Sequence, residues 1–257
     1  MKFKSTLKKT FKIILICALW IGAWAILAAI VDKEILLPSP LTVLTKLTHL
    51  ATEKEFYISS GFSLLRVLLG ISLSTVAALL TAYLTTKIKL LHDILSPLIT
   101  VIKATPVASF ILLAVLWINK EILPAFISFL IIFPIIWSNT EMGIFKIDKQ
   151  YVELANVFKI SSFQRLKRIY IPSVMPYFIS AMRTSIGLAF KAAIAAEVLF
   201  PSINSIGKAL NDAKVYFQIA DLFAWTAVVI LFSFVMEYLF GAMLKKLGKH
   251  YNAKGGF

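Results

Sequence analysis

Apolar residues are gathered into six long stretches, and polar residues occupy the segments between them. The stretches run near residues 11–31, 58–84, 94–118, 122–140, 174–199 and 222–244. A helix of roughly 20 apolar residues crosses the hydrocarbon core of a bilayer, and within lipid the backbone groups must be bonded inside the segment. Runs such as residues 125–133 do not alternate between polar and apolar, which argues against membrane strands. The pattern predicts an all-α membrane protein with six transmembrane helices in a single transmembrane domain over residues 1–257.

The first stretch has two interpretations. It follows a basic start and is about 19 residues long, which is longer than the h-region of a typical signal peptide. No clear small-x-small cleavage site precedes Asp32. A retained span is therefore favoured over a cleaved signal peptide. The basic residues of this start are Lys2, Lys4, Lys8, Lys9 and Lys12.

Composition and charge support a membrane protein and orient it. Hydrophobic residues make up 59% of the chain and charged residues 16%, whereas soluble domains carry about 25% charged residues. With the N-terminus in the cytosol, the cytosolic segments 1–12, 85–93, 141–173 and 245–257 hold 17 Lys and Arg, against 6 in the outer segments. This asymmetry follows the positive-inside rule. We expect a multi-pass protein of the cytoplasmic (inner) membrane with both termini cytosolic, and no nucleic-acid partner, because the net charge of +14 is a topology signal.

The cytosolic segment 141–173 is predicted to form two short helices. Val152, Ala155 and Phe158 form an apolar stripe on the first helix. Ser161 and Gln164 have the spacing of a capping box that starts the second helix, and Pro172 is expected to end it near Ile171. Helices this short are not stable alone in water, so they need the membrane domain behind them and a partner in front. That partner is either a cytosolic protein or, through the basic side chains, anionic lipid.

The residues of this segment resemble the EAA loop of the membrane subunits of ABC importers. Glu153-Leu154-Ala155 is followed, at the spacing of that loop, by Ile169-x-Ile171-Pro172, and Lys159 stands at the position of its glycine. Further stretches resemble the nitrate/sulfonate/taurine-type permease branch, and together they cover roughly residues 58–245. They include Ser63–Gly70, Lys103–Ala108, Ile169–Arg183, Ala195–Leu199 and Ser205–Leu210.

The resemblance implies a type I ABC importer permease (MetI-like) architecture and a set of partners. The implied function is the translocation path of an ATP-driven importer for a small anionic or zwitterionic solute, of the nitrate/sulfonate/taurine or vitamin-precursor type. The implied partners are an ABC ATPase subunit, an extracytoplasmic solute-binding protein, a second permease copy (a homodimer) and the lipid bilayer. No P-loop occurs in the chain, so we expect no enzymatic activity and no cofactor here, with ATP and Mg²⁺ held by the ATPase. The implied coupling residues are Glu153, Ala155, Phe158, Lys159, Ser161, Ile169 and Pro172. Glu153 would pair with a basic residue of the ATPase, and Ala155 and Phe158 would enter an apolar cleft.

Charged residues inside the predicted spans are candidates for the translocation path, because a charge at mid-bilayer costs at least about 2.5 kcal/mol. Lys103 precedes Thr105-Pro106, where the third stretch is expected to break and expose backbone groups to a cavity. Arg183, Lys191 and Glu197 are expected on one broad face of the fifth span. The alternative is ion pairing that fixes helix packing, for example Lys191 with Glu237. For Arg66, snorkelling to the interface is an equal alternative.

Other functional classes are less well supported. A secondary transporter driven by an ion gradient is the main alternative, although no internal repeat is visible. An intramembrane enzyme would need a convergent catalytic set, and no such set or metal-ligand spacing is found. The solute itself is not encoded in a recognisable motif.

Overall fold

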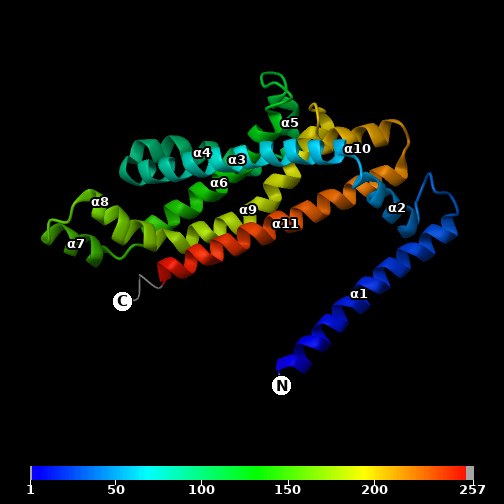
Figure 1. The fold of residues 1–257 in the computed structure, drawn as a ribbon. Coiled ribbons are helices and arrows are strands. Elements are labelled where there is room, and N and C mark those ends of the chain that lie inside the picture. Colours follow the sequence, from blue (N-terminus) through cyan, green and yellow to red (C-terminus); the bar gives the residue numbers. More distant parts are fainter. Residues whose placement is uncertain (1, 253–257) are drawn as a thin grey trace.

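The computed structural model describes residues 2–252, and their regular secondary structure is helical, with no strand (Figure 1). The helices are α1 (Lys2–Val31), α2 (Pro40–Leu50), α3 (Lys54–Lys87), α4 (Lys89–Ala104), α5 (Val107–Ala114), α6 (Leu123–Phe145), α7 (Lys149–Val157), α8 (Ser162–Arg165), a π-helical turn (Leu166–Tyr170), α9 (Ile171–Leu199), α10 (Ile206–Val215) and α11 (Ile219–Asn252).

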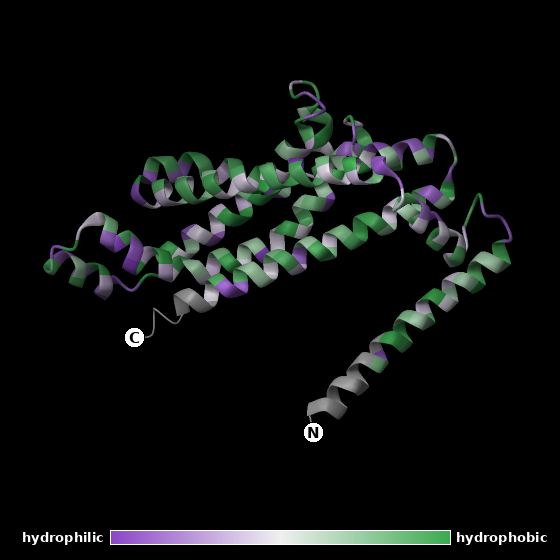
Figure 2. Cartoon of the chain, viewed as in Figure 1, coloured by the Kyte–Doolittle hydropathy of each residue, from purple (hydrophilic) through white to green (hydrophobic). Residues whose placement is uncertain are grey.

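A bundle of α3, α6, α9 and α11 forms the core, with α6 between α3 and α9. Its buried side chains include Val67, Ile136 and Phe190, each fully inaccessible. Close approach of α3 and α6 depends on Gly70, where a Cβ atom would lie 2.6 Å from that of Ser128. Small residues at such contacts allow membrane helices to pack without a hydrophobic driving force between them. The outward surfaces of the bundle are apolar (Figure 2), as an environment of lipid requires.

The six predicted spans are confirmed in number when the third is counted as a bent one. Five helices are long and apolar enough to cross a membrane: α1, α3, α6, α11 and the continuous run Ser162–Leu199. The sixth is the pair α4 and α5, which are bent by 106° at Thr105-Pro106. Proline lacks an N–H and restricts the residue before it, so the break lies where the sequence predicts it.

Helix α1 stands apart from the bundle (Figure 1). Of its apolar residues Ile14–Val31, only 6% are buried. Its contact with the bundle includes stacking of Trp24 on Phe223 of α11, with ring centroids 5.9 Å apart. Its exposed apolar side chains suit a lipid environment.

Two further helices lie in segments that the hydrophobic pattern leaves as loops. Helix α2 begins after Ser39, whose side chain accepts a hydrogen bond from the Thr42 N–H, and α10 begins after Ser205, which caps Lys208 in the same way. Both lie at the end of the bundle away from α7 and α8 (Figure 1). We call this the α10 end and the opposite one the hairpin end.

Candidate functional site

The hairpin of α7 and α8 is joined by a tight turn of defined geometry. Asp148 caps the start of α7 by accepting the Gln150 N–H at 3.0 Å. At its end, the Ile160 N–H donates to the Ala155 carbonyl at 2.9 Å and the Lys159 N–H donates to the Asn156 carbonyl at 3.0 Å. This is the Schellman pattern, which needs a left-handed residue at its centre. Lys159 fills that position with φ of 47°, so a residue with a Cβ occupies a conformation that glycine adopts without strain.

Arg165 holds the two arms of the hairpin together. Its Nη2 donates to the Ala155 carbonyl and its Nε donates to the Ile160 carbonyl, both at 3.0 Å. The predicted N-cap is confirmed, since the Ser161 hydroxyl accepts the Gln164 N–H at 3.4 Å. The role of Arg165 was not predicted, because the sequence shows a basic residue in the first turn but not the carbonyl groups that it reaches.

Pro172 does not end the second helix, and that expectation is wrong. The chain passes from α8 into α9 through the π-helical turn Leu166–Tyr170, where the Ile171 N–H donates to the Leu166 carbonyl. A π turn adds one residue and widens the spacing of backbone bonds, which accommodates the ring of Pro172 and its missing N–H at the start of α9. The hairpin is therefore continuous with the longest run of helix in the bundle.

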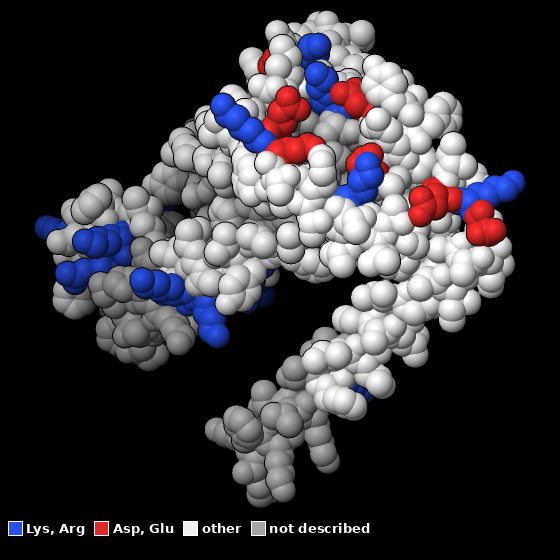
Figure 3. Space-filling view, turned by 45° about the vertical axis from the view of Figure 1, so that its right-hand side comes forward, with Lys and Arg blue, Asp and Glu red and all other residues white. Residues whose placement is uncertain are grey.

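The hairpin presents an apolar tip beside a carboxylate. Ala155 is fully buried under its own hairpin, which contradicts the expectation that it would enter the cleft of a partner. Glu153 and Lys159 are exposed, and Ile169 and Pro172 are half-buried. We define the hairpin tip as the exposed apolar side chains Leu154, Val157, Phe158 and Phe163, of which Val157 is 75% exposed and Phe158 72%. In Figure 3 the side chains coloured at the hairpin end are basic, whereas acidic and basic side chains mix at the α10 end.

The break between α4 and α5 opens a small cavity of about 260 Å³. Lys103 and Thr105 line it together with Val107 of α5 and Leu188 of α9. The Lys103 ammonium donates to the Ser138 hydroxyl at 2.9 Å. The first N–H groups of α5 have no partner within that helix and carry the positive end of its dipole. A lysine and a helix N-terminus at a break in a membrane helix favour a negatively charged group.

Arg183 and Lys191 are both exposed on α9, and Gly187 lies between them on the same stripe of the helix. The carboxylate of Glu237 from α11 occupies the space beside Gly187, with the carboxyl carbon 2.9 Å from where a Cβ would be. Among the residues that the structure describes, Lys191 and Glu237 form no ion pair within 4.0 Å, so the packing alternative has no direct bond to support it. This part of α9 and α11 therefore carries three charged residues, Arg183, Lys191 and Glu237, within segments long and apolar enough to span a membrane.

Glu197 lies elsewhere, with a fully buried side chain in a network that joins three helices. Its carboxylate accepts the Ser63 hydroxyl at 2.7 Å and the Gly207 N–H at 3.2 Å. Arg66 contacts the same carboxylate at 3.4 Å and Glu121 at 2.7 Å, so its guanidinium is ion-paired with two acids. The expectation that Glu197 lies on one broad face with Arg183 and Lys191 is wrong, because Glu197 is buried and both basic residues are exposed. It holds the N-terminus of α10 against α3 and α9, where a carboxylate is favourable.

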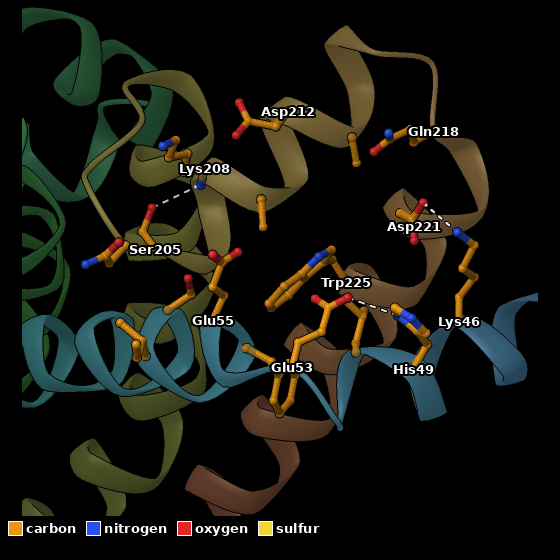
Figure 4. A pocket seen from close by; sticks show the side chains of 17 residues that line it. Lys46, His49, Glu53, Glu55, Ser205, Lys208, Asp212, Gln218, Asp221 and Trp225 are labelled. Atoms are coloured by element: carbon orange, nitrogen blue, oxygen red, sulfur yellow. Dashed lines mark hydrogen bonds and ion pairs between the residues drawn. The ribbon is translucent and has the colours of Figure 1, made fainter.

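A larger polar pocket of about 630 Å³ lies at the α10 end (Figure 4). It is formed by α2, the start of α3, α10 and the start of α11. The outer pocket, as we call it, is lined by charged and aromatic side chains that include Lys46, Glu53, Glu55, Phe56, Asp212, Asp221 and Trp225. Among the residues whose side chains the structure describes, no group of three or more potential metal ligands occurs.

The comparison with known proteins identifies the class of molecule. A model of the family described as "binding-protein-dependent transport system inner membrane component" matches residues 70–249. The chain belongs to this family. It is therefore a permease of ABC importers, with the MetI-like type I fold, and not itself an enzyme.

Several curated relatives of this permease carry names that state a solute. It is 25% identical over 249 residues to a putative aliphatic sulfonates transport permease of Bacillus subtilis, covering 95% of this chain and 88% of the relative. It is 30% identical over 189 residues to a nitrate import permease of Synechocystis, covering 69% and 68%. A bicarbonate transport system permease of Synechocystis is 31% identical over 164 residues, covering 63% and 58%.

Proposed function

We propose that this permease forms the translocation path of an ATP-driven importer for a small anionic or zwitterionic solute. In this proposal an ABC ATPase subunit, which binds the ATP and Mg²⁺, docks on the hairpin, and an extracytoplasmic binding protein delivers the solute at the α10 end. A second copy of the chain completes the path as a homodimer, and both termini lie in the cytosol.

The hairpin carries this proposal. Its turn is locked by backbone bonds and by Arg165, so the tip is presented in one geometry rather than as a mobile loop. An exposed carboxylate at Glu153 beside a compact apolar tip suits a cleft with an apolar floor and a basic residue at its edge. Because the hairpin continues into α9, force applied there reaches the bundle directly.

The docking role is tested by Glu153→Arg and Phe158→Ala in the complete complex. We expect the ATPase subunit to be lost on co-purification and solute uptake to fall at least tenfold. Lys149→Ala, a change at an exposed residue at the start of α7, is the matched control and should leave both unchanged. Intact co-purification and uptake in both variants would reject the docking role. Uptake that continues without ATPase but follows an ion gradient would favour a secondary transporter.

The alternative that the hairpin binds anionic lipid instead of an ATPase can also be tested. It rests on three exposed basic residues of the hairpin, Lys159, Lys167 and Arg168. If the hairpin lies on anionic lipid, its binding would weaken steeply with salt and would not require the ATPase. Protection of the tip from proteolysis by vesicles alone, and not by the ATPase subunit, would support that reading over docking.

The path is proposed to follow two features: the cavity at the α4–α5 break, with Lys103 and Thr105, and the α9 stripe with Arg183 and Lys191. Both offer positive charge at membrane depth, which a negatively charged solute group would meet on its way across. Because the side chain of Glu197 is buried in the described chain, we assign it a role in positioning α10 and not in the path. Lys191→Gln and Lys103→Gln should each lower uptake of an anionic solute by several-fold with the complex intact. Unchanged uptake of nitrate, alkanesulfonates and taurine would remove that lysine from the path.

A further inference from the structure

The outer pocket has a surplus of negative charge. Four carboxylates line it, from Glu53, Glu55, Asp212 and Asp221, against the two ammonium groups of Lys46 and Lys208. Asp221 is paired with Lys46 at 3.2 Å, and Glu53 contacts His49 at 2.9 Å. In the described part of the chain, Glu55 and Asp212 have no ion pair, and Lys208 has none either. The lining therefore favours an added positive group over a negative one.

The floor of the pocket is aromatic. Trp225 is buried and only 7% exposed, and its ring lies 5.5 Å from the ring of Phe56. Figure 4 shows the indole in the middle of the pocket, with labelled carboxylates from both sides of the cavity around it. An aromatic face ringed by carboxylates suits a guanidinium or an ammonium, because the ring attracts a cation and the carboxylates accept its N–H groups.

The rim beside the pocket is apolar and exposed. Helix α10 ends in a second Schellman turn, in which the Gln218 N–H donates to the Ala213 carbonyl at 2.8 Å and Phe217 takes a φ of 55°. Ala213 and Gln218 both line the pocket, so this turn is part of its wall. Tyr216 is 71% exposed and Phe217 72%. Exposed aromatic side chains next to a charged socket have the composition of a protein interface, in which aromatic and arginine anchors dominate.

We propose that the outer pocket is the docking socket for a lysine or arginine side chain of the extracytoplasmic binding protein, with Tyr216 and Phe217 packing against the surface around that side chain. The occupant is a protein rather than the membrane, because anionic headgroups would be repelled by the surplus carboxylates. A free cation would fill the pocket but would leave Tyr216 and Phe217 exposed. A protein that inserts a basic side chain would also cover these two aromatic residues, so the occupant is a protein. This inference rests on the proposed function, in which that partner approaches the α10 end.

The experiment uses the permease–ATPase complex in lipid nanodiscs and the extracytoplasmic binding protein of the proposed importer. The affinity of the binding protein is measured against salt for the unaltered complex and for the double variant Glu55→Gln/Asp212→Asn. We expect at least a tenfold loss of affinity and a weaker salt dependence in the variant, because attraction between the surplus carboxylates and the basic side chain is removed. Phe217→Ala should lower affinity at all salt concentrations, since the contact that it removes is apolar.

Glu34→Gln is the matched control, because Glu34 is an exposed acid at the same end of the molecule but outside the pocket. The glutamine amide oxygen can still accept the hydrogen bond from the Thr42 hydroxyl. This control should leave affinity unchanged, and basal ATP hydrolysis should be equal in all variants. Equal affinity of the double variant and the control would overturn the socket while leaving the proposed function standing. Absence of binding to the unaltered complex would instead overturn the partner itself. A loss of solute-stimulated hydrolysis without a change in affinity would also contradict docking.

Discussion

The guanidinium of Arg165 binds the backbone carbonyl of Ala155 across the turn of the hairpin, with Nη2 3.0 Å from the oxygen. The same carbonyl already accepts the Ile160 N–H of the Schellman turn. One oxygen thus receives both the bond that closes the turn and the bond that ties the second arm to the first. The shape of the hairpin tip depends on this shared acceptor, although neither residue reaches into solvent as the tip does.

Replacing Arg165 by alanine should loosen the hairpin without changing its surface. The change removes two hydrogen bonds from a charged donor, each worth roughly 1.5–3 kcal/mol at most. The Ile160 carbonyl loses its Arg165 partner, whereas the Ala155 carbonyl keeps the Ile160 N–H. We expect the ATPase subunit to dissociate more easily and limited proteolysis to cut between α7 and α8 faster. Arg168→Ala is the control, since Arg168 is exposed and belongs to the same segment. Equal cleavage rates in the two variants would show that Arg165 does not hold the turn.

Lys159→Gly should stabilise the turn. The left-handed conformation costs lysine about 1–2 kcal/mol, and glycine removes this cost. Part of the gain is offset, because glycine loses more conformational entropy on folding. We therefore expect a gain of up to about 1 kcal/mol in local stability, measured by hydrogen exchange of the Ile160 amide. Lys159→Ala separates side chain from backbone, because it removes the charge and keeps the Cβ. An equal gain in the alanine variant would mean that charge, not conformation, limits the turn.

Glu197→Leu should destabilise the bundle by about 3 kcal/mol or more, because it leaves Arg66 and the N-terminus of α10 without their buried carboxylate. Glu197→Gln keeps an acceptor for Ser63 or Gly207 and should cost less. Thermal unfolding in detergent, followed by the loss of the monodisperse species, measures the difference. If leucine proved as stable as glutamate, the network would contribute nothing to holding α10 in place.

Gly207→Ala should also be destabilising, and for a steric reason. A Cβ at Gly207 would lie 2.5 Å from the Glu197 carbonyl carbon and 2.6 Å from the Val198 nitrogen, and backbone atoms cannot move aside as a flexible side chain can. Gly241→Ala makes the same change in α11 where nothing lies within 4 Å, and it should be neutral or favourable by up to about 1 kcal/mol through helix propensity. Opposite effects of the two substitutions on thermal stability are expected, and matching effects would contradict the close contact.

The spans could be predicted from the sequence because hydrophobic length alone specifies a membrane helix. The break at Thr105-Pro106 could also be predicted, since proline acts on the chain locally. The two end helices were missed although Ser39-Pro40 is a recognisable start signal, because the short apolar content of α2 and α10 does not stand out beside the spans.

The site was predictable only where it is local in sequence. The N-cap at Ser161 follows from neighbouring residues, and the left-handed position of Lys159 corresponds to the glycine of the EAA loop that the segment resembles. The partners of Glu197 lie 134 residues away at Ser63 and 131 away at Arg66, and no spacing rule connects them. The burial of Ala155 likewise depends on how the second arm folds back over the first, which the apolar stripe on α7 does not encode.

The π-helical turn at Leu166–Tyr170 makes the stretch from Ser162 to Leu199 one continuous helical run of 38 residues, about 57 Å along its path at the rise of an α-helix. One end of this helical run belongs to the hairpin. Near the other end, Glu197 accepts a hydrogen bond from the Gly207 N–H at the start of α10. In the proposed docking role, movement of the hairpin would be transmitted along this helix to the α10 end, because no loop interrupts it. The π-helical turn widens the backbone spacing immediately beside the hairpin, and Pro176 interrupts the backbone bonds further along. In the proposed docking role, bending at the π-helical turn would change how much of the hairpin's movement reaches the bundle.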